Sequence, residues 1–395
     1  MNGPIKLAAP LVIAVALAAC NAGGSSSVPA AGVQTGGALQ NSTLEASGYH
    51  RVCADTRAGY MNCDALTMSN ISPGVAGLAP ADFQKAYNLP ITKGSGQIVA
   101  IVDAYDNPNA ASDIKTYRTQ FGLGTASFTK YNQSGQKSHY PVGNTGWGVE
   151  EDLDIEMVSA SCPLCTIYLI EANTNNSNDL YAAVAEAAKL GAHIISNSYG
   201  GGGGSSSYGD FAKKGVTYLA SAGDNGYGEQ DPADYDTVDS IGGTTLSKQG
   251  STYKEQTWAF SGGGCSVVTK PSWQHDPKCS LRTGNEVSAV ASGVAEYDSY
   301  GGYGWFTVGG TSVSSPLLAG VFGLAGNAST HQSGKPFWTL KPLKLKHSLH
   351  NITVGGVIHC PPSLAGSYLC VAGTKQYKTY AGPTGWGTPN GIGAF

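Results

Sequence analysis

From about residue 81 onward, short apolar runs alternate with segments in which apolar residues recur at helical spacing. The apolar runs are expected to form buried strands: 97–102, 166–170, 193–196 and 216–221. Helical patterns lie between them, one beginning near Pro108 and an alanine-rich one at 180–190. Apolar strands separated by helices indicate an α/β domain of three layers, with a mostly parallel central sheet and helices on both faces.

Two aspartates follow predicted strands. In parallel sheets, sites gather at the carboxyl ends of the strands. Asp103 comes directly after the first strand, and Asp224 follows the strand at 216–221 in the motif Ser221-Ala222-Gly223-Asp224. Asp224 could simply form a turn. It could instead point into a site and, when protonated, donate a hydrogen bond to an oxyanion.

The motif Gly309-Gly310-Thr311-Ser312 precedes an apolar run of helical character at 317–325. This arrangement puts the Ser312 hydroxyl at a tight turn into a helix N-terminus. The glycines allow a substrate backbone to come close, and the helix dipole favours negative charge. A serine that only caps the helix would give the same local pattern.

A serine nucleophile needs a base, and the segment 146–158 offers carboxylates on a partial helical stripe. Glu150 and Asp154 are four residues apart and share one helix face, where they repel each other. One of them should stay partly protonated at mildly acidic pH. An acidic solvated turn would look similar. A glycosidase carboxyl pair is a further alternative, but it leaves the glycine-serine turn unexplained.

Composition limits the classes of function. The chain has 395 residues, of which 41% are hydrophobic, so a sizeable core can form. Charged residues make up only 13%, about half the usual share, which suits acidic surroundings because little self-repulsion develops when carboxylates protonate. The formal net charge of -4 gives no reason to expect nucleic acid as a partner.

The N-terminus predicts export. Lys6 precedes an apolar run at 7–19 that is too short for a stable membrane anchor. The run ends in Leu17-Ala18-Ala19-Cys20, which resembles the bacterial lipobox, and that resemblance implies cleavage before Cys20 and a lipid on its thiol. An ordinary signal peptide is the alternative. Asn21 favours the outer over the inner membrane.

These features divide the chain into four parts. Residues 1–19 are a signal peptide, and 20–45 are the lipidated cysteine and a flexible Gly/Ser tether. Residues 46–80 form a short extension, and 81–395 form the main domain. We expect a monomer in the cell envelope, or outside the cell, that touches the membrane only through its lipid.

With Cys20 used by the anchor, eight of the nine cysteines remain. An even number in an exported chain indicates disulfides. Their short spacings favour four local pairs: Cys53 with Cys63, Cys162 with Cys165, Cys265 with Cys279, and Cys360 with Cys370. Cys162-Pro-Leu-Cys165 could instead be a redox pair or half of a zinc site, but no second such pair accompanies it.

Together the motifs resemble those of the sedolisin family, the serine-carboxyl peptidases, whose fold is subtilisin-like. Glu150-x-x-Leu153-Asp154 looks like the family's Glu/Asp helix, and Ser221-Ala222-Gly223-Asp224 is similar to its oxyanion-aspartate loop. The histidine motif of subtilisins is absent. Further similar motifs are Gly242-Gly243-Thr244, Ser261-Gly262-Gly263-Gly264, Pro271-x-Trp273-Gln274 and the tail at 382–391. The resemblance covers roughly residues 78–395.

The resemblance implies a role for each site residue. Ser312 attacks the peptide carbonyl, Glu150 takes its proton, Asp154 orients Glu150, and neutral Asp224 stabilises the oxyanion. It implies substrate contacts from Gly309, Gly310, Ser261, Gly262 and Gly263. Protein or peptide substrates, endopeptidase action and an acidic optimum follow from it. With no histidine to orient, we expect Asp103 to be a supporting or structural group.

Two departures from the family pattern bear on these expectations. At the family's calcium site, Asn351 precedes Ile352, and Ala381 stands for an expected carboxylate, so calcium should bind weakly or not at all. The extension at 46–80 is too short for the long pro-region of many members. A catalytically weak or inactive binding lipoprotein on the same fold is therefore the alternative function.

Overall fold

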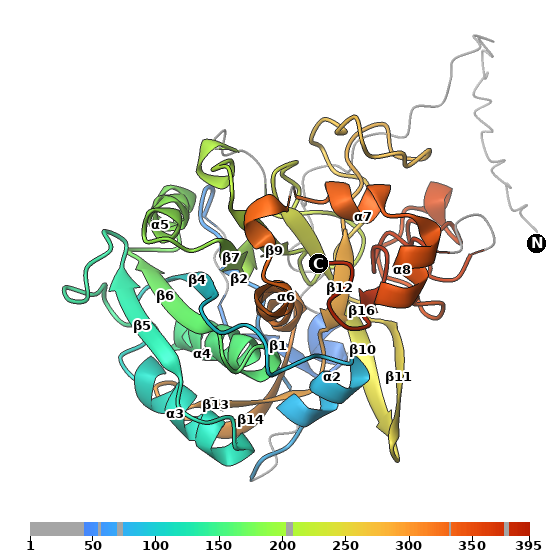
Figure 1. Ribbon diagram of the computed structural model, residues 1–395. Coiled ribbons are helices and arrows are strands. Elements are labelled where there is room, and N and C mark those ends of the chain that lie inside the picture. The colour runs from blue at the N-terminus through green and yellow to red at the C-terminus, as the bar shows by residue number, and fades with distance from the viewer. Residues whose placement is uncertain (1–42, 54–56, 69–73, 203–207, 332, 375–378) are drawn as a thin grey trace, which may run out of the picture.

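The computed structural model describes residues 43–53, 57–68, 74–202, 208–331, 333–374 and 379–395 (Figure 1). The predicted signal peptide, Cys20 and most of the predicted tether lie outside these ranges. Within the described residues, no helix is both long enough and apolar enough to cross a membrane.

An eight-stranded central sheet organises the molecule. Its strands run in the order β11-β10-β9-β7-β4-β6-β5, and β12 also pairs with β10. Every pair is parallel except β10 with β11. The strand bounds are β4 (Ile98–Ala104), β5 (Ser127–Asn132), β6 (Thr166–Ala172), β7 (Ile194–Asn197), β9 (Thr217–Ser221), β10 (Asp239–Gln249), β11 (Thr252–Thr257) and β12 (Val287–Val290). The predicted α/β fold with a mostly parallel sheet is confirmed. Its strands are apolar without interruption because helices cover the sheet on both sides.

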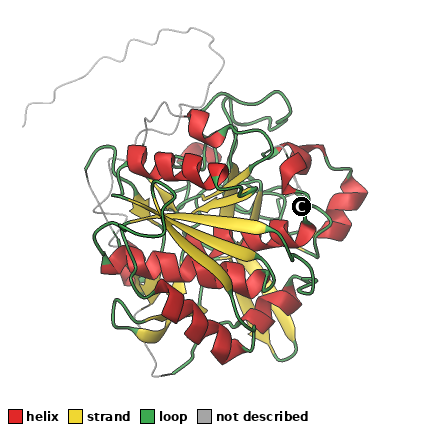
Figure 2. Ribbon diagram, turned by 60° about the vertical axis from the view of Figure 1, so that its left-hand side comes forward, coloured by secondary structure: helices red, strands yellow, loops and turns green. Residues whose placement is uncertain are grey.

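Helices lie on both faces of this sheet (Figure 2). They are α2 (Pro80–Ala86), α3 (Ala110–Phe121), α4 (Thr145–Ser161), α5 (Ser177–Lys189), α6 (Thr311–Ala325), α7 (Lys335–Thr339) and α8 (Pro342–Ser348), with short 3-10 turns at Tyr208–Phe211, Ala328–Thr330 and Pro362–Leu364. Helix α4 is buried from Trp147 to Ser161 and packs against α6. The two helices can approach closely because Gly320 has no side chain. A Cβ at this position would lie 1.9 Å from Oγ of Ser161.

The N-terminal residues are built into the domain by strand pairing. A four-stranded antiparallel sheet has the order β1-β3-β14-β13, with β1 (Tyr49–Arg51), β3 (Leu66–Met68), β14 (Gly304–Gly309) and β13 (Val294–Asp298). Strand β2 (Asn62–Cys63) pairs antiparallel with β8 (Tyr199–Gly200), and β15 (Leu349–His350) pairs with β16 (Thr388–Pro389). Leu44, Leu66 and Trp258 share an apolar cluster, so this segment also contributes to a core.

The eight cysteines form four disulfides between neighbours in the chain. The pairs are Cys53–Cys63, Cys162–Cys165, Cys265–Cys279 and Cys360–Cys370. The Cys162–Cys165 bridge closes the turn between α4 and β6, and a Cβ on Gly323 of α6 would lie 2.5 Å from the Cys165 sulfur. This bridge is therefore part of the packing between α4 and α6.

Candidate active site

Ser312 lies in the first turn of α6, directly after β14. The turn between them requires glycine, because Gly310 has a φ of 116° and a Cβ there would lie 1.8 Å from the carbonyl oxygen of Asp64. The Ser312 side chain is fully buried, and its hydroxyl donates a hydrogen bond of 3.3 Å to the Ser198 carbonyl oxygen. The sequence predicted Ser312 at a tight turn into a helix N-terminus, and this position is confirmed.

The two acids of α4 reach this serine. Glu150 and Asp154 are fully buried, and their carboxyls are hydrogen-bonding neighbours of each other. The Ser312 hydroxyl lies near enough to the Glu150 carboxyl to lower its pKa, although Oε1 of Glu150 has no hydrogen-bond partner among the described residues. Asp154 accepts a bond of 2.8 Å from the Ser198 hydroxyl, so Ser198 contacts both Asp154 and Ser312.

Burial raises the pKa of the Glu150 carboxyl well above its usual range, and the charges of Asp154 and Asp103 raise it further. Burial also raises the pKa of Asp154, and the charge of Asp103 adds to the effect. The nearby Ser312 hydroxyl lowers the Glu150 pKa, but by less than burial raises it. Two buried carboxyls in contact favour a shared proton, so the pair is expected to hold one proton under mildly acidic conditions.

Asp103 at the end of β4 is a third acid near this pair. It is fully buried, and among the described residues neither of its carboxyl oxygens has a hydrogen-bond partner. Burial raises its pKa to about 8. A neutral Asp103 therefore adds no repulsion to the pair, whereas a charged one would oppose ionisation of both Glu150 and Asp154.

Asp224 approaches the same turn from the loop after β9. Its Oδ1 accepts hydrogen bonds from the Thr311 backbone N–H at 2.8 Å and from the Thr311 hydroxyl at 2.9 Å. Its Oδ2 has no partner among the described residues and lies 2.8 Å from the position of a Cβ on Gly310. Burial raises the Asp224 pKa well above its usual range, followed in size by the charge of Asp64. A neutral Asp224 can therefore present a proton on Oδ2 beside Ser312.

The residues predicted for substrate contact divide into two groups. Gly309 pairs with Leu66 in the ladder between β14 and β3. Gly262 and Gly263 instead hold the Asp224 loop, because Gly262 N–H donates to Gly223 at 2.7 Å and Gly263 N–H donates to Gly228 at 2.8 Å. The Ser261 hydroxyl donates to the Pro383 carbonyl at 2.9 Å. Their substrate-binding role remains a prediction.

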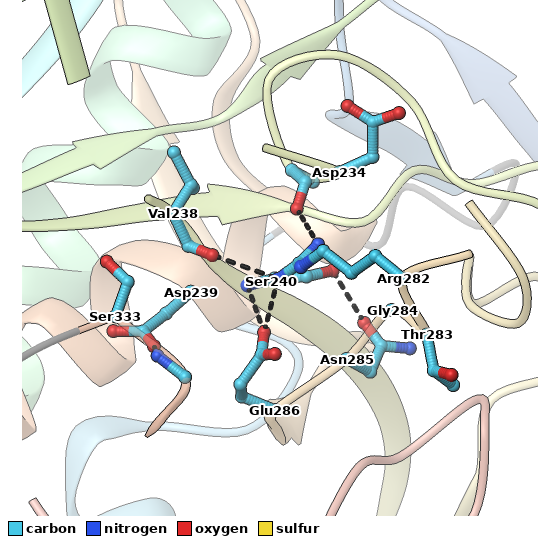
Figure 3. A network of polar contacts seen from close by, with 12 residues as sticks. Asp234, Val238, Asp239, Ser240, Arg282, Thr283, Gly284, Asn285, Glu286 and Ser333 are labelled. Carbon is cyan, nitrogen blue, oxygen red and sulfur yellow. Dashed lines mark hydrogen bonds and ion pairs between the residues drawn. The ribbon is translucent and has the colours of Figure 1, made fainter. Parts of the chain in front are cut away.

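A buried polar network holds the segment 261–263 that contacts the Asp224 loop (Figure 3). Arg282 donates to Glu286 at 2.9 Å, and both side chains are fully buried. Glu286 also accepts from the Ser240 backbone N–H at 2.8 Å, and the Ser240 hydroxyl donates to Asn285 at 3.1 Å. The Asn285 amide then donates to the Gly262 carbonyl at 2.8 Å. The network thus connects a buried ion pair to the glycine segment that holds Asp224.

Three contributors to the site were not predicted from the sequence. Ser198 follows β7, and its place at a strand end is a signal that the strand pattern offers. Asp64 and Ala65 belong to the segment 46–80, for which the sequence predicted only a short extension and no site residue. Their backbone enters the site because β2 and β3 pair with strands far along the chain, and no local motif indicates such pairing.

The residues of the predicted degenerate calcium site offer no carboxylate to a cation. Ile352 and Ala381 are buried and pack with Ala372 in a small apolar cluster, while Asn351 is exposed. Calcium needs about six to eight oxygen ligands, and these apolar side chains supply none. Weak or absent calcium binding remains the prediction.

Among the residues that the structure describes, one group of acids has the spacing of metal ligands. Carboxyl oxygens of Asp113, Asp152 and Asp298 lie within 4.8 Å of one another. Burial and the charges of the other two raise the pKa of Asp152 well above its usual range. Asp152 lies two residues from Glu150 on α4 and therefore points to a different helix face. The group stands apart from the serine turn, and protons can balance its charge.

The fold and the site geometry can be compared with those of known proteins. Residues 95–384 match the subtilase family, so the chain belongs to that family. Among the relatives that the chain is similar to are kumamolisin and, in fold, Pseudomonas sedolisin, a serine-carboxyl proteinase.

The relatives support this placement. Kumamolisin from Bacillus sp. (strain MN-32) is 29% identical over 324 residues, covering 70% of this chain and 57% of kumamolisin. Xanthomonalisin from Xanthomonas sp. (strain T-22) is 27% identical over 193 residues, covering 43% of this chain and 21% of that protein. The chain thus spans little more than half the length of the first relative. The structure of Pseudomonas sedolisin complexed with two molecules of pseudo-iodotyrostatin has a TM-score of 0.68 at 22% identity, covering 80% of this chain and 96% of the sedolisin chain.

Proposed function

We propose that this protein is a serine-carboxyl endopeptidase, with Ser312 as its nucleophile and Glu150 as its general base. One observation carries the proposal: Ser198 bonds both the Ser312 hydroxyl and the Asp154 carboxyl beside Glu150, while the unpaired Oδ2 of Asp224 faces the same turn. A nucleophile, a base and an oxyanion donor at one turn are the components of acyl transfer.

The proposed reaction has two stages. Ser312 Oγ attacks the peptide carbonyl carbon, its proton passes to Glu150, and protonated Asp224 and the Ser312 backbone N–H stabilise the oxyanion. Glu150 then protonates the leaving amine, which leaves an ester on Ser312. Water hydrolyses that ester with Glu150 again taking the proton. Asp154 orients Glu150 and shares its proton.

The raised pKa of Asp224 keeps its carboxyl protonated at acidic pH, as an oxyanion donor requires. Asp224 must be protonated to donate, and Glu150 must be unprotonated to act as a base. Activity is therefore expected to fall as pH rises through the Asp224 pKa and to fall as pH drops through that of the Glu150–Asp154 pair. A bell-shaped profile is the expected result. The predicted export and lipid anchor at Cys20 remain part of this proposal.

The decisive assay follows cleavage of a denatured protein from pH 3 to pH 7. Ser312→Ala and Glu150→Ala should both abolish cleavage, whereas wild-type protein should cut with an acidic optimum. Ser314→Ala is the matched control, because Ser314 is on the same helix and its hydroxyl bonds only the backbone carbonyls of Ala289 and Val290. No cleavage by the wild type at any pH would support the binding-protein alternative instead.

A further inference from the structure

Five buried acids come from three elements that pack against one another. Helix α3 packs on α4, and both helices pack on β13. Acids four residues apart on α4 share one helix face, and acids two residues apart on β13 point to the same side of the strand. The five form one acidic cluster: Asp113 on α3, Asp152 and Glu156 on α4, and Glu296 and Asp298 on β13.

Among the described residues, no cationic side chain balances the acidic cluster. None of its carboxyls forms an ion pair with lysine, arginine or histidine. The strongest charges acting on Asp152, Glu156 and Glu296 are instead those of other acids of the cluster. Several charged carboxylates cannot leave water unless positive charge compensates them. At neutral pH the acidic cluster therefore needs either several protons or a cation.

Glu296 is directed into the acidic cluster with both carboxyl oxygens unpaired. It is 0% exposed, and neither oxygen has a hydrogen-bond partner among the described residues. It lies on the same side of β13 as Asp298, and its strongest electrostatic neighbours are Asp152 and Asp298. Oδ1 of Asp152 and Oε1 of Glu156 are also buried without a partner in this part of the chain. Free buried oxygens that converge in this way are the ligands that a hard cation takes.

The remaining ligand oxygens are held in place by donors around the acidic cluster. Asp298 accepts hydrogen bonds of 2.8 and 2.9 Å from backbone N–H groups of the turn at 299–301, and Asp113 accepts one of 2.9 Å from the same turn. The Asn107 amide donates to Oδ2 of Asp152 at 2.8 Å. Donors of this kind orient a carboxylate and leave its other lone pairs for a metal ion.

We propose that the acidic cluster binds one Ca²⁺ ion. Calcium takes about six to eight oxygen ligands at about 2.3–2.6 Å, so two oxygens on opposite sides of the ion are about 5 Å apart. Carboxyl oxygens of Asp113, Asp152 and Asp298 lie within 4.8 Å of one another, which allows them to share one ion. Glu296 supplies the unpaired oxygens. The site is distinct from the family's calcium position near Asn351 and Ile352.

The ion joins the two parts of the fold that carry the site residues. Helix α4 carries Glu150, and β13 pairs antiparallel with β14, which leads directly to Ser312. A cation between α4 and β13 therefore stabilises the arrangement of base and nucleophile without contacting either. Protons compete for the same carboxyls, so calcium should bind more tightly at pH 7 than at pH 4.

The test uses the full-length Ser312→Ala chain, stripped with a chelator at pH 7, so that its outcome is independent of the proposed peptidase function. Calorimetric titration with calcium chloride should show one site per chain. The melting temperature should rise by about 3 to 5 °C at a hundredfold excess of calcium over the Kd. Magnesium chloride should bind more weakly, because Mg²⁺ demands shorter bonds and keeps its waters. At pH 4 the calcium affinity should fall by about tenfold or more.

Two variants and a control locate the ion. Glu296→Gln and Asp298→Asn should each weaken calcium binding by about tenfold or more, because each removes an anionic ligand and keeps the side-chain size. A cooperative melt at pH 4 that matches the parent chain shows that these variants fold. Asn351→Ala, at the family's calcium position, should bind calcium as the parent does.

Three results would overturn the proposal. Absence of calcium binding at pH 7 would mean that protons alone balance the acidic cluster. Binding that persists unchanged in both Glu296→Gln and Asp298→Asn would place the ion elsewhere. Binding lost in Asn351→Ala would place it at the family's position.

Discussion

The backbone N–H of Ala65 donates a hydrogen bond of 2.8 Å to Oε2 of Glu150. The Ser312 hydroxyl lies near the same carboxyl. Peptide hydrolysis requires a proton to move from the nucleophile to the leaving nitrogen. In the proposed mechanism Glu150 carries that proton, and its bond to Ala65 shows that its carboxyl can accept from a backbone nitrogen.

Glu150→Gln should lower kcat about 100- to 10,000-fold with little change in KM, because glutamine keeps the hydrogen bonds but cannot carry the proton. Steady-state kinetics on a peptide substrate at pH 4 measure this. Glu156→Gln is the matched control on the same helix, since Glu156 accepts from the Tyr297 backbone instead. Equal losses in both variants would mean that the effect comes from folding.

Asp224→Ala should lower kcat about 100- to 1000-fold, because one oxyanion donor is lost. Asp224→Asn should retain more activity, since its amide can donate from the position of Oδ2 while its oxygen accepts from Thr311. The asparagine amide needs no proton from solution. The decline in activity toward neutral pH should therefore disappear in Asp224→Asn, and an unchanged pH profile would count against Asp224 as the donor.

Thermal stability should fall as pH rises from about 4 to about 8. Burial raises the pKa of Asp103, Glu229 and Asp234 to about 8 and that of Glu286 to about 7. Their unfolded values lie near 4, so between these limits the folded state binds more protons. The stabilisation is complete below the unfolded pKa and is lost as pH rises through the folded pKa. Calorimetry on the calcium-free Ser312→Ala chain tests this, and a midpoint that rises toward pH 8 would refute it.

At pH 8, where the Glu286 carboxyl is ionised, Arg282→Met should destabilise the protein by about 3 to 5 kcal/mol, because it leaves this buried carboxylate without its ion-pair partner. Urea unfolding of the Ser312→Ala chain with and without this change measures the loss. The double change Arg282→Met with Glu286→Leu should recover part of it. Without such recovery, the loss would have to come from packing rather than from charge.

The strands and helices of the main domain could be predicted from the sequence because each is a local pattern. The run at 97–102 became β4, and the run at 216–221 became β9. Glu150, Asp154 and Asp224 could be proposed together only through family resemblance, since spacing alone fixes no distance between α4 and the loop after β9. The path of Asp64 and Ala65 could not be predicted, because it depends on pairing with Tyr199, Gly200 and Gly309, far along the chain.

The most direct test of the account is to trap the covalent intermediate. A peptide ester is mixed with the protein at pH 4, the reaction is stopped with acid within milliseconds to seconds, and the digested protein is analysed by mass spectrometry. If Ser312 is the nucleophile, one acyl group should be found on the peptide that contains Ser312, and it should be absent in Ser312→Ala. Turnover of the ester with no acylated protein, or with the acyl group on another residue, would contradict it.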